Sequence, residues 1–117
     1  RKLSTMFNIN IKNLYDYEKV MRHYYAPEDK AENVYPSLLP QWDRSPRSGL
    51  NGIYIHSTPQ KFAKTLAEAL HLIKHKQPEH QILFLKSWNE WAEGNYVEPD
   101  LKFGRGYLDV LRKQILE

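Results

Sequence analysis

The sequence predicts an α/β protein built from the C-terminal βα units of a TIM-like (β/α)8 barrel. Apolar periodicity gives the order helix, strand, helix, strand, helix, and alternation of this kind is typical of parallel sheets. A run of carboxylate and indole side chains directly follows one predicted strand, where barrel active sites are built. No Gly-rich phosphate loop separates strand from helix, which disfavours an open nucleotide-binding sheet.

The chain is too short for a whole barrel. Such a barrel takes about 250 residues, whereas the chain has 117. We therefore expect residues 1–117 to form a single domain fragment, with the remainder of the barrel upstream. The first residue is Arg1 and not Met, which agrees with this expectation. Two or three barrel units leave sheet edges and apolar helix faces uncovered, so we expect the fragment to behave poorly in isolation.

The composition is that of an ordinary folded protein, with 41% hydrophobic and 26% charged residues. The formal charge of +3 comes without a basic block, so nucleic acid is not an expected partner. The absence of cysteine excludes disulfides and thiolate metal sites, and it fits a cytoplasmic location. No stretch is apolar over the length of a membrane span, and none follows the start as a signal peptide would.

The first predicted element is an amphipathic helix over residues 13–25, with apolar residues at helical spacing, and it ends before Pro27. Residues 34–39 form a short apolar run with one proline, which predicts a strand with an irregular point. Residues 40–52 contain two glycines and one further internal proline, and they predict a long loop. Loops of this length are usually functional or mobile.

The second helix has the clearest signals in the chain. Thr58 can cap its first turn, and Pro59 suits the first helical position. One apolar stripe follows, formed by Phe62, Leu66, Ala69, Leu70 and Ile73. Residues 81–87 then predict a strand that is apolar on both sides, as in a parallel sheet covered on both faces. The last helix begins around Arg105.

The most informative segment follows that strand and reads Trp88-Asn89-Glu90-Trp91-Ala92-Glu93-Gly94. Acid/base chemistry at a glycosidic bond needs two carboxyl groups held close together in different environments. Indole faces can stack on the C–H faces of pyranose rings while the N–H hydrogen-bonds. Residues three apart on a regular strand face opposite sides, so Glu90 and Glu93 converge only in irregular backbone. With that condition, the segment predicts a carbohydrate site whose catalytic pair is Glu90 and Glu93.

A second group of candidates lies in the loop over residues 40–52. An indole there can stack on a sugar, and the nearby acidic and basic side chains can bind hydroxyls or a phosphate. A surface loop pinned by one buried tryptophan is the alternative. Together with three residues of the Trp/Glu segment, the candidates in this loop are assigned to substrate binding: Trp42, Asp43, Arg47, Trp88, Asn89 and Trp91.

No metal and no cofactor is expected. His71 and His75 lie one helical turn apart, as metal ligands can, but they share a polar helix face that favours solvent. His56 stands beside Ser57, yet no Gly-x-Ser-x-Gly elbow accompanies them, so a Ser/His hydrolase is rejected.

The segment from Trp88 to Gly94, followed by Glu98-Pro99-Asp100, Gly104 and Tyr107-Leu108, resembles the signature of the WbsX-type glycosyltransferases. These belong with the glycoside hydrolase family 99-like barrels. The resemblance extends upstream to the segment Pro40-Gln41-Trp42-Asp43-Arg44-Ser45-Pro46-Arg47 and to Ser57-Thr58-Pro59. It covers residues 35–111 and is more specific for the family than for the reaction.

The resemblance implies roles for both glutamates. In the family 99 endo-hydrolases, which act on α-linked mannose, the two glutamates of the matching motif are the catalytic pair. By this resemblance, Glu90 is the base that takes the proton from the sugar 2-hydroxyl. Glu93 is the acid/base that protonates the departing oxygen and then activates the acceptor.

Two departures from the hydrolase pattern bear on the reaction. The hydrolases carry histidine at the position of Ala92, whereas WbsX-type members usually have alanine there. This residue therefore favours the synthetic branch. Gln41 and Arg44-Ser45 replace the commoner Gly and Asn-Thr, which leaves the donor or acceptor preference open. We therefore expect a glycosyltransferase of bacterial cell-surface polysaccharide biosynthesis, either lipopolysaccharide O-antigen or capsule, that acts on a carbohydrate with an activated sugar donor. An endo-acting glycoside hydrolase on α-linked, mannose-like glycans and a noncatalytic glycan-binding module are the alternatives.

Overall fold

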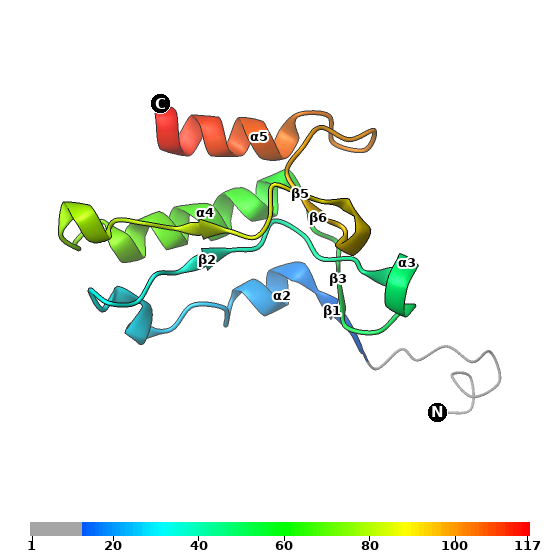
Figure 1. Cartoon of the computed structure of the whole chain (residues 1–117), viewed down its shortest axis with the longest axis horizontal. Coiled ribbons are helices and arrows are strands. Elements are labelled where there is room, and N and C mark those ends of the chain that lie inside the picture. The colour runs from blue at the N-terminus through cyan, green and yellow to red at the C-terminus, as the bar shows by residue number, and fades with distance from the viewer. Residues whose placement is uncertain (1–12) are drawn as a thin grey trace.

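Short strands and helices alternate along residues 13–117, the part of the chain that the computed structural model describes (Figure 1). The strands form three two-stranded sheets. Strand β1 (Leu14–Asp16) pairs in parallel with β3 (Ile53–Ile55). Strand β2 (Ser37–Leu38) pairs in parallel with β4 (Phe84–Leu85). Strand β5 (Asn89–Glu90) pairs with β6 (Asn95–Tyr96) in an antiparallel hairpin.

The mixed α/β prediction is confirmed, together with its parallel strands. A closed barrel is not seen among residues 13–117, where the two parallel pairs form separate open sheets. The predicted strand over residues 34–39 is shortened to Ser37–Leu38, and the one over 81–87 to Phe84–Leu85. Each of these strands has one hydrogen-bonded neighbour in this part of the chain, which limits how far its ladder extends.

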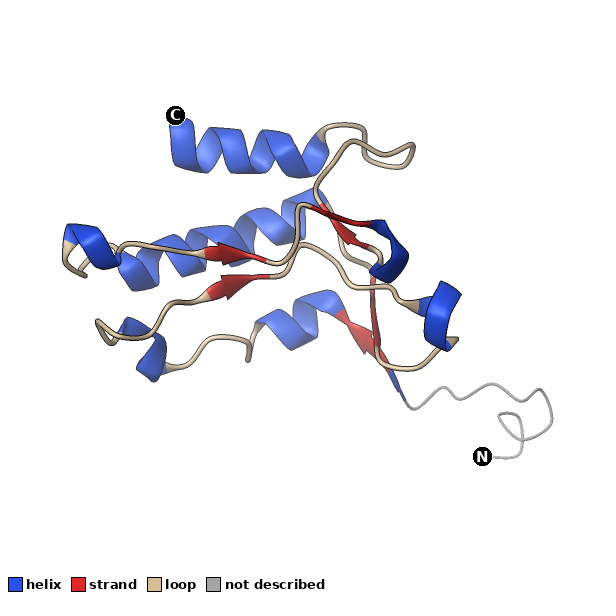
Figure 2. Ribbon diagram, in the orientation of Figure 1, coloured by secondary structure: helices blue, strands red, loops and turns tan. Residues whose placement is uncertain are grey.

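Helix α4 (Pro59–Ile73) begins where the sequence predicts. The Thr58 hydroxyl accepts a hydrogen bond from the backbone N–H of Lys61 at 3.2 Å, which caps the first turn. The predicted apolar stripe faces the main core: Phe62, Leu66 and Ala69 are fully buried against Leu38 and Val97. Helix α4 lies alongside the β2–β4 pair, between α2 and α5 (Figure 2).

The prediction of one helix over residues 13–25 is wrong at both ends. Residues 14–16 form strand β1, and helix α2 spans only Tyr17–Met21. The Asp16 carboxylate accepts a hydrogen bond from the Lys19 N–H at 3.1 Å, so the helix starts after Asp16. The fully buried Tyr17 donates its hydroxyl proton to the Leu39 carbonyl at 2.8 Å. This bond fixes α2 on a second core cluster, which is formed by Tyr17, Met21 and Leu39.

The predicted loop over residues 40–52 contains a short helix, α3 (Ser45–Ser48). Strand β3, which follows it, was not predicted. Helix α5 (Gly106–Leu111) starts one residue after Arg105 and continues as a π-helical segment, Arg112–Leu116. Three short 3-10 helices complete the described elements: Pro27–Lys30, Pro78–His80 and Trp91–Glu93.

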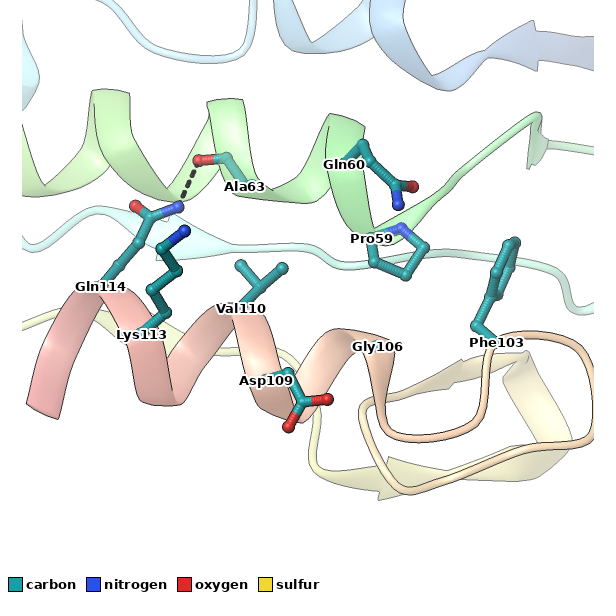
Figure 3. Close-up of a pocket in the computed structure, with 9 residues that line it drawn as sticks. All are labelled: Pro59, Gln60, Ala63, Phe103, Gly106, Asp109, Val110, Lys113 and Gln114. Atoms are coloured by element: carbon teal, nitrogen blue, oxygen red, sulfur yellow. Dashed lines mark hydrogen bonds between the residues drawn. The ribbon is translucent and has the colours of Figure 1, made fainter. Parts of the chain in front are cut away.

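Helices α4 and α5 pack against each other, and an open pocket of about 490 Å³ lies along their contact and reaches Phe103 (Figure 3). The side-chain amide of Gln114 donates a hydrogen bond to the Ala63 carbonyl at 2.9 Å and ties the end of the chain to α4. His71 on α4 and His75, which follows the end of that helix, are both exposed, as predicted. No helix in residues 13–117 combines the length and apolar character needed to cross a bilayer.

The buried Tyr107 side chain makes the free energy of unfolding fall at alkaline pH. Its ring is buried and its hydroxyl lies 2.7 Å from the Ser57 hydroxyl. Burial raises the pKa of Tyr107 from 10.0 to about 12. The folded state favours the neutral phenol. The contribution of this preference to the free energy of unfolding is therefore complete below pH 10 and is lost as the pH rises through about 12. The substitution Tyr107→Phe should therefore make the fall in unfolding free energy above pH 10 less steep, as measured by urea titrations. Equal steepness in both proteins would contradict this.

Candidate functional site

The candidate catalytic segment forms a tight hairpin directly after β4. Strand β5 leads into the 3-10 turn Trp91–Glu93, and Gly94 then reverses the chain with a positive φ of 53°. A Cβ atom on Gly94 would lie 2.5 Å from the backbone oxygen of Asp43. Glycine therefore lets the hairpin pack directly against the loop that follows β2. This irregular turn supplies the backbone that the carboxylate-pair hypothesis requires.

Trp91 is braced at the edge of the hairpin. Its indole stacks on the Tyr96 ring with centroids 3.7 Å apart and planes 12° apart. Its N–H donates a hydrogen bond to Oε2 of Glu98 at 2.6 Å. The Tyr96 hydroxyl in turn donates to Asp100 at 2.9 Å, and burial followed by this bond raises the Tyr96 pKa to about 12. The Trp91 side chain stays 47% exposed, so part of the indole remains available for stacking on a sugar.

Glu93 contacts the second group of candidate residues. Its Oε1 lies 3.4 Å from Nη1 of Arg47 on α3. Its backbone carbonyl accepts a hydrogen bond from the N–H of Asp43 at 3.0 Å. Two segments 46 residues apart in the sequence thus meet at one place. Arg47 therefore contacts one of the two catalytic candidates. The Asp43 carboxylate accepts a hydrogen bond from the backbone N–H of Ser45 at 2.9 Å.

Glu90 is held by a different set of partners. It ends β5 opposite Asn95, and its backbone N–H donates to the Ser87 hydroxyl at 3.2 Å. The Glu90 side chain is exposed. Since separate contacts support Glu90 and Glu93, the action of the two carboxyl groups as one acid/base pair stays a prediction.

The remaining candidates line the same end of the fold. Trp42 packs partly against the second core cluster, and Nζ of Lys86 lies 5.0 Å from its ring centroid. Trp42 therefore packs against the core on one side and contacts the ammonium group of Lys86, beside the hairpin. Trp88 is 53% exposed, and Asn89 is exposed on β5. In Figure 1, α3 and the β5–β6 hairpin lie at the same end of the molecule.

A family model with the description Glycosyltransferase WbsX matches residues 1–111. The chain belongs to this family. The resemblance inferred from the Trp/Glu segment is therefore confirmed. The membership does not by itself show catalysis, and the roles of the individual site residues stay predictions.

The chain is also similar to two curated proteins. The chain is 32% identical over 105 residues to the uncharacterized protein WxcX of Xanthomonas campestris pv. campestris strain B100. The matched stretch is 88% of this chain and 15% of that protein. The chain is 38% identical over 84 residues to WxcX of strain ATCC 33913, and this matched stretch is 70% of the chain and 12% of that protein. The chain thus spans only a small part of the length of these relatives. No solved structure matches it.

The candidate site also contains supporting residues that the sequence did not indicate. Ser87 and Asn95 hydrogen-bond to each other beneath the hairpin, and Lys86 lies over Trp42. These are common polar residues without a characteristic spacing. Glu98 accepts the hydrogen bond of the Trp91 indole and so supports the hairpin.

Proposed function

We propose that the chain carries the carboxylate pair of a WbsX-family glycosyltransferase that assembles bacterial cell-surface polysaccharide, either lipopolysaccharide O-antigen or capsule. The observation that supports this most is the contact of the glutamate hairpin with the loop of Trp42 and Arg47, which gathers acidic, basic and aromatic side chains at one end of the fold. This combination suits a sugar with an activating phosphate. The lack of cysteine fits the cytoplasm, where we propose that the step occurs.

In the proposed reaction, the Glu90 carboxylate takes the proton from the donor 2-hydroxyl, whose oxygen then attacks the anomeric carbon. Glu93 protonates the departing oxygen, so the donor bond breaks as the internal bond forms. Glu93 then takes the proton from the acceptor hydroxyl, whose oxygen attacks the anomeric carbon and forms the new glycosidic bond. The internal bond to the 2-oxygen breaks in this step, and Glu90 returns its proton to that oxygen, which restores both carboxyl groups to their starting states. The exposed part of Trp91 would stack on the sugar ring during these steps.

We also propose that β2 and β4 are neighbouring strands at the end of a TIM-like barrel. Their parallel register places Leu38 opposite Leu85, and both pack on the core that α4 covers. Large apolar side chains beside these two residues are exposed: Tyr35 at 38%, Ile82 at 43% and Phe84 at 59%. An apolar sheet face without a cover is what the interior of a barrel becomes when its other strands are absent.

Assays on the full-length protein test this proposal. The protein is incubated separately with labelled activated sugars plus acceptor and with α-linked oligosaccharides. Transfer of label to the acceptor supports the glycosyltransferase. Release of new reducing ends, without transfer, would support an endo-acting hydrolase instead. Sugar binding without turnover in either assay would support a noncatalytic module.

A further inference from the structure

Ser87 lies between β4 and the hairpin and uses its hydroxyl in two directions. The hydroxyl donates its proton to the backbone carbonyl of Asn95 at 2.7 Å. It also accepts the backbone N–H of Glu90 at 3.2 Å. A serine hydroxyl has one proton to donate and lone pairs to accept, so both bonds form at the same time. Ser87 therefore joins the two strands of the hairpin from below.

Asn95 completes this arrangement from the opposite strand. It is fully buried, and its Oδ1 accepts the backbone N–H of Ser87 at 2.7 Å. Its Nδ2 is buried without a hydrogen-bond partner among residues 13–117. A buried amide donor without a partner destabilises the fold. An apolar side chain would avoid that penalty but would leave the Ser87 N–H unpaired, so the structural use of Asn95 lies in its Oδ1.

Three residues thus form a closed set of contacts around the Glu90 backbone. Glu90 and Asn95 are register partners across the hairpin, and Ser87 bonds to both. Ser87 is two residues beyond Leu85, which packs on the main core. The position of Glu90 is therefore tied to the core through β4. Glu93 is tied instead to the loop containing Asp43 and Arg47.

We propose that Ser87 and Asn95 are positioning residues for Glu90, which they hold at a fixed place relative to the sugar 2-hydroxyl. This inference rests on the proposed function, in which Glu90 is the base. The Ser87 hydroxyl touches no reacting atom and acts only through the Glu90 backbone. Its loss should therefore lower turnover more than it lowers substrate binding.

The test compares Ser87→Ala, Ser87→Thr and the control Ser57→Ala in the full-length protein. Ser87→Ala removes both hydroxyl contacts, whereas Ser87→Thr keeps a hydroxyl. Ser57 also uses its hydroxyl twice, toward the Pro40 carbonyl at 2.5 Å and the Tyr107 hydroxyl at 2.7 Å, but it lies outside the hairpin. Amide hydrogen exchange of peptides covering residues 86–97 and steady-state kinetics are measured for each variant.

We expect faster exchange in residues 86–97 of Ser87→Ala, with kcat about 10- to 100-fold lower and KM nearly unchanged. Ser87→Thr should restore both, and Ser57→Ala should change neither. Unchanged exchange in Ser87→Ala would overturn the bracing role. Faster exchange with normal kcat would overturn the positioning role. If the wild-type protein shows no turnover, the proposed function fails, and the exchange data alone decide whether Ser87 holds Glu90.

Discussion

Replacing Glu93 with Gln should lower turnover about 10²- to 10⁴-fold while substrate affinity stays nearly the same. The amide can neither give nor take the proton that the proposed acid/base step transfers. Its carbonyl can still accept a hydrogen bond from Arg47, which lies 3.4 Å from the Glu93 carboxylate. The backbone bond from Asp43 is also independent of the side chain. Transfer kinetics and calorimetric binding in the full-length protein measure the two effects separately.

Glu68→Gln is the matched control, because Glu68 is exposed on α4. It should leave both turnover and affinity unchanged. A Glu93→Gln variant that turns over substrate at the wild-type rate would remove Glu93 from the chemistry. A variant that loses affinity while kcat stays unchanged would indicate that Glu93 binds substrate and transfers no proton.

Replacing Gly94 with Ala should destabilise the hairpin strongly. Gly94 has a φ of 53°, and the new Cβ would lie 2.5 Å from the oxygen and 2.9 Å from the nitrogen of the Asp43 backbone. The left-handed conformation costs about 1–2 kcal/mol for a residue with a Cβ. Overpacking against the Asp43 backbone adds about 1–3 kcal/mol. Denaturant titration of the full-length protein should show this loss in the transition that includes the hairpin.

Gly104→Ala separates the two contributions. Gly104 has a nearly equal φ of 54°, but nothing lies within 4 Å of the position that its Cβ would take. This control should therefore lose only the conformational part, about 1–2 kcal/mol. Equal losses in the two variants would show that the contact between Gly94 and Asp43 is not tight in solution.

Local signals in the sequence were sufficient for α4. The capping threonine, the proline after it and the apolar stripe all lie within one segment, and each describes a contact between near neighbours. The parallel strands β2 and β4 were also predicted from short apolar runs. The Trp/Glu segment led to the correct family because its residue types and order are unusual.

Long-range contacts were not predictable in the same way. Strands β1 and β3 have three residues each, too few for a periodic pattern, and they form by pairing residue 14 with residue 53. Asp16 gave a local cap signal that would have placed the helix start correctly. The partner of Arg47 is set by the packing of α3 against the hairpin, which residue spacing does not encode. The sequence therefore offered candidate residues for the site but not the contacts that hold each one.

The chain contains three tryptophans, and all of them lie in the two loops that form the candidate site. Trp91 is stacked on a tyrosine, Trp42 lies beneath a lysine, and Trp88 is more than half exposed. The tryptophan fluorescence of this chain therefore originates entirely at that end of the molecule. It provides an optical reporter of ligand entry and of local solvent that requires no attached label.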